Sequence, residues 1–459
     1  MAQVITYLII TSGGLVNLMH AKLDSGIDKA YNTREPRETL LDFLHTLSQI
    51  SQSILFTMRK NYSNRCFVPV ISLLLLVAVI AVSNTYYTFP NQNIPWLRST
   101  SSKRSGQACD IFRGEWVPDP DAPYYTNETC SVIHEHYDCM RFGKPDLGFV
   151  KWRWRPDGCD LARLDPARFL AVMRGKSMAF VGDSLAKNHM QSLICLLTRV
   201  AEPKVSWPSS KHTVYYYGEH NFTVANFWAP YLVRHEQIDE DGPAHTGLWN
   251  LYLDEPDAVW AAHVAAFDYV VVSASSWFYR PAMLYESGRL VGCHYCLLPN
   301  VTDLTLRYAL RMATRAALRA LDGADGRFRG TAVLRTVSPS QYENGEWNSD
   351  GDCVRKRPSR HGEKKLQGVE LDFHRLQLEE FAAAERAART ASGGAVRMML
   401  MDTTEAMILR ADAHPSKYRG WTPEKYFKVY HDCVHWCLPG AIDTWNDMLL
   451  HMLTSDESR

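Results

Sequence analysis

The stretch SMAFVGDSLAKNHMQSL, residues 177–193, decides the fold class of this 459-residue chain. Residues 177–181 are apolar and have the length of a buried strand, whereas apolar residues recur with a helical period across 185–200. Gly-Asp-Ser at 182–184 joins the two segments without a spacer. A buried strand that turns directly into a helix is typical of an α/β domain.

Other segments repeat this alternation further along the chain. Residues 269–273, 332–337 and 398–401 have the pattern of buried strands, and residues 303–321 and 371–389 have that of amphipathic helices. Strands that alternate with helices predict a central parallel sheet flanked by helices on both faces.

The composition excludes two broad classes of protein. Fifty Lys and Arg balance fifty Asp and Glu, which argues against a nucleic-acid-binding protein. With 46% hydrophobic and 22% charged residues the chain is not disordered and can bury a large core. Arginines at every fourth position from 307 to 319 are more typical of a solvated helix face than of an anion-binding stripe.

Residues 67–82 (FVPVISLLLLVAVIAV) contain no charge and predict a membrane span. At about 1.5 Å per helical residue the run reaches roughly 25 Å, which suits the thinner membranes of the early secretory pathway. Arg59, Lys60 and Arg65 precede it, and the next basic residue is Arg98. The positive-inside rule therefore predicts a type II membrane protein, with its bulk in the lumen.

This topology divides the chain into four parts. We expect a cytosolic segment at 1–65, a transmembrane signal anchor at 66–83, a stem linker at 84–108 and a luminal catalytic domain at 109–459. Because Met58 directly precedes the basic flank, we interpret residues 1–57 as dispensable or as a gene-model extension.

Ten of the eleven cysteines follow the apolar run, which predicts disulfides in an oxidising lumen. Cys293 and Cys296 form a single CxxC pair, for which a local disulfide is favoured over a metal site; no metal is expected. Glycosylation sequons at Asn127, Asn221 and Asn300 all lie on the predicted luminal side.

The Gly-Asp-Ser turn is the first candidate for chemistry. It places the Ser184 hydroxyl at a helix N-terminus, where free N–H groups stabilise an oxyanion. Gly182 permits a sharp turn and Asp183 can cap the helix. The alternative is that Ser184 serves only as a helix cap.

Asp432 and His435 form a second candidate in VYHDCVHWCLPG. Three residues apart in a helix or turn, they share a face, so that the carboxylate can orient the imidazole. Together with Ser184 they supply a Ser-His-Asp triad. The alternative is an unremarked surface pair, which the flanking Cys433 and Cys437 disfavour because disulfides would fix the loop.

Long blocks around both candidates resemble the plant trichome birefringence-like family of polysaccharide O-acetyltransferases, which carry an SGNH/GDSL-like PC-esterase domain. The resemblance covers about residues 109–455 and includes these blocks: CDIFRGEWVPDPDAPYYTNETC, FVKWRWRPDGCDLARLD, GDSLAKNHMQSL, LRTVSPSQYENGEWNSDGDCVR, DTTEAMILRADAHPSKY and DCVHWCLPGAIDTWN. The block FDYVVVSASSWFYRPAMLYESGRLVGCHYC is most similar to the branch that contains xyloglucan O-acetyltransferases.

The resemblance implies a ping-pong acetyl transfer to a cell-wall polysaccharide, with xyloglucan side-chain galactose as the favoured acceptor. Ser184 would be the nucleophile, His435 the general base and Asp432 its orienting acid. Alternatives are a xylan or mannan acetyltransferase, a polysaccharide acetylesterase, and a non-catalytic wall-polymer binding protein. No cofactor is expected to be bound. The acetyl donor, either acetyl-CoA or a group relayed by a membrane protein, is not specified by any motif.

The resemblance also implies disulfide pairs and a region that contacts the acceptor. The implied pairs are Cys109–Cys159, Cys130–Cys195, Cys139–Cys437 and Cys353–Cys433, which leave Cys293–Cys296. The aromatic and basic residues expected in an acceptor groove are Trp152, Trp154, Trp277, Trp436, Arg153, Arg155 and Arg280; core packing is the alternative for the tryptophans.

Three residues depart from the family pattern: Ser275 and Ser276 replace a Gly and a His or Gln before Trp277, and Gln341 replaces a His. We expect these changes to alter contacts to the acceptor or the oxyanion.

Overall fold

The computed structural model describes residues 109–209, 211–238, 247–391, 393, 395–420 and 431–455. The predicted cytosolic segment, anchor and stem lie outside these residues. Residues 108–459 form one compact unit. Within the described part of that unit, no helix is both long and apolar enough to cross a membrane.

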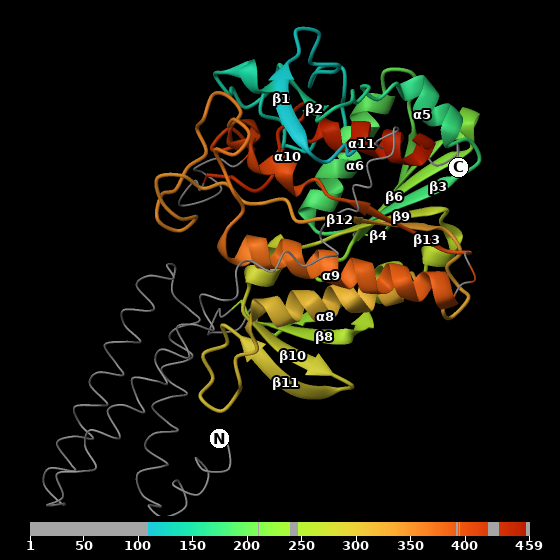
Figure 1. Cartoon of the computed structure of the whole chain (residues 1–459), viewed down its shortest axis with the longest axis vertical. Helices are drawn as coiled ribbons and strands as arrows, with labels where there is room; N and C mark the ends of the chain where they lie inside the picture. Colours follow the sequence, from blue (N-terminus) through green and yellow to red (C-terminus); the bar gives the residue numbers. More distant parts are fainter. Residues whose placement is uncertain are drawn as a thin grey trace, which may run out of the picture. The chain divides into compact units, whose positions relative to one another are not determined.

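A seven-stranded sheet forms the centre of the domain, in the order β13-β12-β9-β3-β6-β5-β4 (Figure 1). The five strands from β13 to β6 are parallel, as predicted, whereas β5 and β4 are added antiparallel. The bounds are β3 Ser177–Gly182, β4 Lys204–Ser209, β5 His212–Tyr217, β6 Phe222–Trp228, β9 Tyr269–Ser273, β12 Thr331–Arg335 and β13 Arg397–Met401.

Helices cover both faces of this sheet (Figure 1). One face carries α5 (Pro166–Val172), α6 (Ser184–Leu197) and α11 (Asp443–Ser455), and the other carries α8 (Thr305–Arg319) and α9 (Gly368–Ala391). Side chains of β3 alternate between two hydrophobic cores: Met178 and Phe180 join one, and Ala179 and Val181 join the other. This two-sided burial explains why the strand is continuously apolar.

Two smaller sheets were not predicted. The antiparallel pair of β1 and β2 (Gly114–Pro118 and Trp152–Pro156) packs beside the first core. A four-stranded sheet has the order β11-β10-β8-β7. Its strands are β7 Val233–Gln237, β8 Trp249–Pro256, β10 Ala282–Glu286 and β11 Arg289–His294. Short helices complete the described chain: η1 Leu147–Val150, η2 Gly218–His220, α7 Ala258–Ala261, η3 Val264–Ala266, η4 Ser276–Tyr279, α10 Thr404–Ile408 and η5 Ala411–Ala413.

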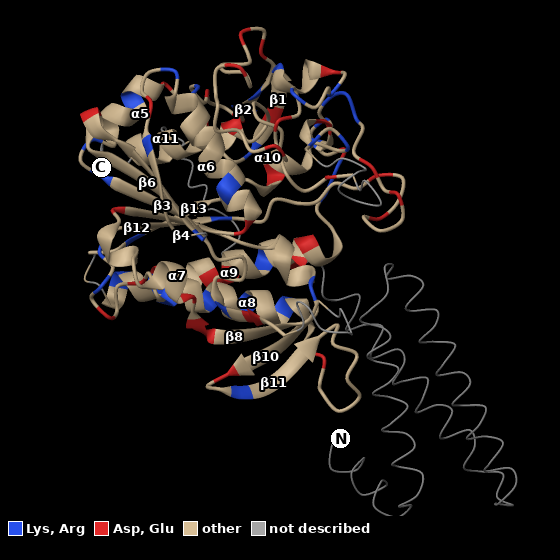
Figure 2. Cartoon of the chain, turned by 180° about the vertical axis from the view of Figure 1, so that it is seen from behind, with Lys and Arg blue, Asp and Glu red and all other residues tan. Residues whose placement is uncertain are grey.

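The arginine series on α8 is engaged by α9. Arg311 bonds both Glu379 and Glu380, at 2.7 and 3.0 Å, and Arg315 bonds Glu380 at 2.8 Å. Arg307 pairs with an aspartate of α9 in the same way. Charges of both signs therefore run along the two helices (Figure 2). Arg307, Arg311 and Arg315 are paired with α9, and Arg319 is exposed, as expected of a solvated face.

Five disulfides join the cysteines of the domain, in the pairs that the family resemblance implies. Cys293, near the end of β11, bonds Cys296 three residues later, which removes the alternative of a metal site there. Two others, Cys139–Cys437 and Cys353–Cys433, fasten the segment that contains Asp432 and His435.

Candidate active site

The turn after β3 requires glycine at position 182. Gly182 has a φ of +152°, and a β-carbon there would lie 1.8 Å from the carbonyl oxygen of Ser273 on β9. The close approach of the two parallel strands therefore excludes any side chain. Two residues later the chain enters α6, whose first residue is Ser184.

Asp183 does more than the predicted capping. One carboxylate oxygen accepts from the Leu185 N–H at 2.9 Å, which caps α6. The other accepts from the Ser275 N–H at 3.2 Å and from the Ser276 hydroxyl at 2.9 Å. This buried carboxylate thus ties the nucleophile turn to the loop that follows β9. The hydroxyl proton of Ser276 is committed to Asp183.

The structure brings the Asp432 and His435 side chains to Ser184. Nε2 of His435 lies 2.6 Å from Oγ of Ser184, and Nδ1 lies 2.8 Å from Oδ2 of Asp432. Asp432 Oδ1 also accepts the backbone N–H groups of Val434 and His435, which bends the segment into a turn. With Nδ1–H donated to the carboxylate, Nε2 is free to accept the serine proton.

Arg419 completes the surroundings of Asp432 and was missed by sequence reasoning. Its guanidinium donates to Oδ2 of Asp432 at 2.6 Å, and both side chains are buried. Burial alone raises the pKa of the Asp432 carboxyl, but the imidazole of His435 and the guanidinium of Arg419 outweigh it and hold that pKa well below its usual range. The sequence holds many arginines, and nothing local marks this one.

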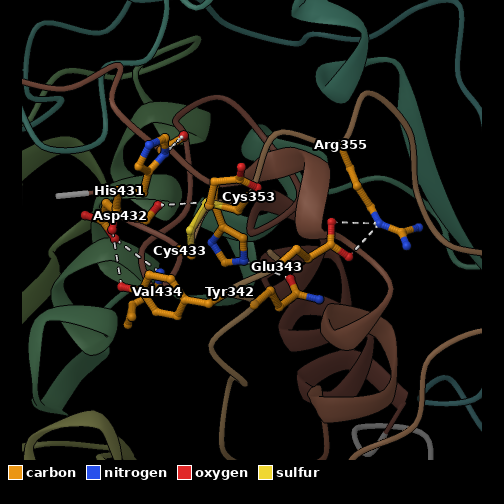
Figure 3. Close-up of a disulfide and its surroundings, with 12 residues drawn as sticks. Tyr342, Glu343, Cys353, Arg355, His431, Asp432, Cys433 and Val434 are labelled. Carbon is orange, nitrogen blue, oxygen red and sulfur yellow. Dashed lines mark hydrogen bonds and ion pairs between the residues drawn. A yellow bond between two sulfur atoms is a disulfide. The ribbon is translucent and has the colours of Figure 1, made fainter. Parts of the chain in front are cut away.

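Long-range contacts hold the loop in place. The disulfide Cys353–Cys433 lies directly beside Asp432 (Figure 3), and backbone bonds in both directions join Asp432 to Ser416. The buried His414 ring lies 2.7 Å from the His435 carbonyl oxygen through Nδ1. The loop thus has several supports outside its own segment.

Family models match nearly all of this unit. Residues 161–452 match the PC-Esterase model, described as a GDSL/SGNH-like acyl-esterase family found in Pmr5 and Cas1p, and residues 107–160 match the PMR5 N-terminal domain. Arabidopsis thaliana protein trichome birefringence-like 19 is 50% identical over 77% of this chain and 83% of its own length. The chain belongs to the trichome birefringence-like family. This confirms the predicted family.

Relatives that are named for an enzymatic activity are less similar to this chain. Xyloglucan O-acetyltransferase 4 of Populus trichocarpa is 40% identical over 75% of this chain and 81% of its own length. Xyloglucan O-acetyltransferase 2 of Arabidopsis thaliana is 38% identical over 75% of this chain and 82% of its own length.

Gln341, one of the three departures from the family pattern, lies inside the domain. Its side-chain oxygen lies 2.8 Å from Nε2 of His414, its amide donates to the Ile408 carbonyl, and its backbone N–H donates to Cys433. The expectation that it contacts the acceptor or the oxyanion is wrong, because the side chain is buried and supports the loop of His435 from behind.

Two of the four tryptophans expected in an acceptor groove are core residues. Trp154 is 1% exposed and donates its indole N–H to the Ile111 carbonyl. Trp436, although adjacent to His435, is 0% exposed, stacks on His414 and donates to Ser338. Neither indole is available to a sugar, so this expectation is wrong for both.

The other residues expected in the acceptor groove on β2 contact the pair of β1 and β2 and its surroundings. Trp152 is half-buried against the first core. Arg153 pairs with Asp160, and Arg155 pairs with Glu115 on the neighbouring strand. The charges of both arginines are thus compensated by neighbouring carboxylates.

Trp277 and Arg280 keep the expected character. The Arg280 guanidinium lies 3.7 Å above the half-buried Trp277 ring and forms no ion pair within the described chain. Trp277 follows Ser276 directly, and Arg280 comes three residues later; the Ser276 hydroxyl bonds Asp183, which links this segment to the turn of Ser184. Sequence reasoning missed the aromatic residues around Trp277, which are Trp228, Tyr231 and Trp249.

The start of α6 offers a place for an oxyanion. The N–H groups of Leu185, Ala186 and Lys187 bond to Asp183, whereas the Ser184 N–H has no acceptor among the described residues. It points from the positive end of the helix. A hydroxyl, a base in contact with it and a free N–H together suit nucleophilic acyl transfer.

Proposed function

We propose that this protein is a polysaccharide O-acetyltransferase that works through an acetyl-Ser184 intermediate. The observation that carries the proposal is the contact of 2.6 Å between Ser184 Oγ and His435 Nε2, with Asp432 held on the far side of the imidazole. Membership of an acyl-esterase family supports it.

In the first half-reaction the Ser184 oxygen attacks the carbonyl carbon of an acetyl donor. His435 Nε2 takes the hydroxyl proton, and the resulting charge on the carbonyl oxygen is stabilised by the Ser184 N–H and the helix dipole. Collapse breaks the bond to the donor, which leaves with the proton from His435. Ser184 then carries the acetyl ester.

In the second half-reaction a sugar hydroxyl attacks this ester. His435 Nε2 removes the hydroxyl proton, and the tetrahedral intermediate collapses to release Ser184, which regains the proton. Water in place of the sugar gives acetate, so the same residues perform hydrolysis. Occupation of the site by the sugar, rather than the triad, decides between transfer and hydrolysis.

We propose xyloglucan side-chain galactose as the acceptor because relatives at 36–40% identity are named xyloglucan O-acetyltransferases. Xylan or mannan is the alternative acceptor. A polysaccharide acetylesterase and a non-catalytic wall-polymer binding protein are the alternatives of a different kind. Ser276 and Ser275, which replace the family's usual residues beside Trp277, are the reason to test several acceptors.

A Golgi type II membrane protein with a luminal active site is part of the same proposal. The apolar run at 67–82 and its basic flank support it. Asn221 and Asn300 are exposed and Asn127 is half-buried, so glycans have access to at least two sequons. The acetyl donor is acetyl-CoA or a group supplied by a membrane protein.

The decisive experiment incubates the purified full-length chain in detergent with an activated acetyl donor. Deacetylated xyloglucan, xylan and mannan oligosaccharides are offered in parallel, and products are read by mass spectrometry beside the Ser184→Ala variant. We expect acetylated xyloglucan from the wild type alone. Free acetate without an acetylated sugar would favour the esterase, and no difference from the variant would favour the binding protein.

A further inference from the structure

A loop beside the catalytic segment carries an exposed tryptophan that the mechanism above does not use. We call residues 343–353 the Trp347 loop. Trp347 is 62% exposed, and the only other tryptophan of the described chain with more than half of its surface exposed is Trp207 at 69%. Trp207 lies on β4, the edge strand at one end of the large sheet.

The Trp347 loop is closed by its own hydrogen bonds. Glu343 and Asp352 exchange backbone hydrogen bonds of 2.6 and 2.8 Å at its base. Within it, the N–H groups of Ser349 and Gly351 both bond to the Glu346 carbonyl. A β-carbon on Gly351 would lie 2.3 Å from the Gly345 carbonyl oxygen, so the chain turns back on itself tightly. Such a loop presents the indole with little conformational freedom to lose on binding.

A covalent bond ties this loop to the candidate active site. Cys353 at its end is bonded to Cys433, the residue after Asp432 (Figure 3). The ion pair of Glu343 with Arg355 fixes the other strand of the base, as Figure 3 shows. Six residues from Trp347 to Cys353 span at most about 20 Å. The Cα atoms of Cys353 and Cys433 are 5.7 Å apart, and His435, two residues after Cys433, contacts Ser184. Trp347 therefore lies within about 40 Å of Ser184, a span that an extended chain of several sugar units covers.

Resting on the proposed function, we propose that Trp347 is a stacking platform for the backbone of a neutral polysaccharide, remote from the hydroxyl that is acetylated. Aromatic faces bind the apolar faces of sugar rings, and an isolated exposed indole on a stiff loop provides such a face. Four acidic residues flank it, namely Glu343, Glu346, Asp350 and Asp352. Arg355 and Lys364 offset the charge of Glu343, but the loop holds three further acidic residues and no basic one. This charge disfavours an anionic polymer and leaves a neutral chain unaffected.

The test measures binding and turnover separately. The Ser184→Ala full-length protein is titrated by calorimetry with deacetylated xyloglucan polymer, alone and with Trp347→Ala added. The matched control is Trp207→Ala, which removes an equally exposed indole at the far edge of the sheet. We expect Trp347→Ala to weaken polymer binding about 5- to 10-fold, Trp347→Phe to retain most of it, and Trp207→Ala to change it by less than about twofold.

Turnover distinguishes a remote platform from a part of the active site. With Ser184 intact, Trp347→Ala should raise KM for the polymer and leave kcat, and the rate with a fragment of one or two sugars, unchanged. Unchanged binding in Trp347→Ala, an equal loss in Trp207→Ala, or the same Trp347 dependence with polygalacturonate would overturn the proposal. If the wild type acetylates nothing while polymer binding still depends on Trp347, the platform stands and the proposed function falls.

Discussion

The two halves of the candidate triad are held in different ways. Ser184 sits where a strand of the central sheet becomes a helix, and its position follows from Gly182 and the first turn of α6. The Asp432 and His435 loop has neither helix nor strand of its own; a disulfide, an ion pair and the buried His414 hold it.

This difference separates local from long-range encoding. A nucleophile turn is specified by a few consecutive residues, because backbone sterics and capping act over that range. The base is placed by partners up to 298 residues away along the chain, the separation of Cys139 and Cys437. Loss of Gly182 should therefore act on the fold, whereas loss of the contacts around the loop should lower activity as well as stability.

The largest effect is expected from removing the residues through which the two halves meet. Ser184→Ala and His435→Ala should each lower kcat about 10³- to 10⁴-fold, and the double variant should lose no more than either, because the two groups act as one unit. Steady-state acetylation of xyloglucan fragments measures this. Losses that multiply in the double variant would mean that the 2.6 Å contact is not the working arrangement.

Gly182→Ala should break the turn by unfolding it. The new β-carbon would lie 1.8 Å from a backbone oxygen, so the expected loss of unfolding free energy is on the order of 4 kcal/mol by chemical denaturation. Gly143→Ala is the control: Gly143 also has a positive φ, +73°, but its β-carbon would meet nothing within 4 Å. We expect about 1 kcal/mol there. Equal losses at both sites would show that φ, and not the contact of β3 with β9, is decisive.

The sequence predicted the locally encoded half well. Four strands and three helices were placed within a few residues, because buried parallel strands and amphipathic helices have distinct periods. The Asp432-His435 spacing also identified the second half. Arg419 and His414 escaped because only the folded chain brings them there. Trp436 was misplaced, since proximity to His435 in sequence says nothing about the direction in which the indole points.

Arg419→Gln tests whether the ion pair with Asp432 is needed to place the loop of His435. Removing the guanidinium takes away the donor that lies 2.6 Å from the buried Asp432 carboxylate, so Asp432 orients the His435 imidazole less firmly, and we expect kcat/KM to fall about 10-fold at neutral pH. Arg419→Lys should restore part of the activity. An unchanged kcat/KM in Arg419→Gln would mean that Asp432 keeps its position without the guanidinium.

The same variant predicts a change in acid stability. The folded-state pKa of Asp432 lies below its ordinary value of 3.8, so ionised Asp432 contributes stability above that pH and loses it as the pH falls through the folded-state value. Without Arg419 the folded-state pKa rises, and acid unfolding followed by circular dichroism should begin at higher pH. Identical acid transitions would contradict this.

Opening one disulfide tests the loop directly. Cys353→Ser with Cys433→Ser should reduce kcat several-fold and unfolding free energy by about 2–4 kcal/mol, because the loop of His435 loses a support. Cys293→Ser with Cys296→Ser serves as the control, because it removes a disulfide that spans only three residues. It should leave kcat unchanged. Equal kcat in both double variants would show that the remaining contacts suffice to place His435.

The smallest effect is expected from Ser276→Ala, which tests the link between the turn of Ser184 and the loop after β9. Asp183 would lose the 2.9 Å bond from the Ser276 hydroxyl but keep those from Leu185 and Ser275, which costs about 1 kcal/mol. If Ser276 acts only by steadying Asp183, kcat should fall about threefold while KM for the acceptor is unchanged. A raised acceptor KM with constant kcat would instead place Ser276 in contact with the sugar. Because the hydroxyl has a single proton and donates it in the hydrogen bond to Asp183, we expect kcat to fall with KM unchanged.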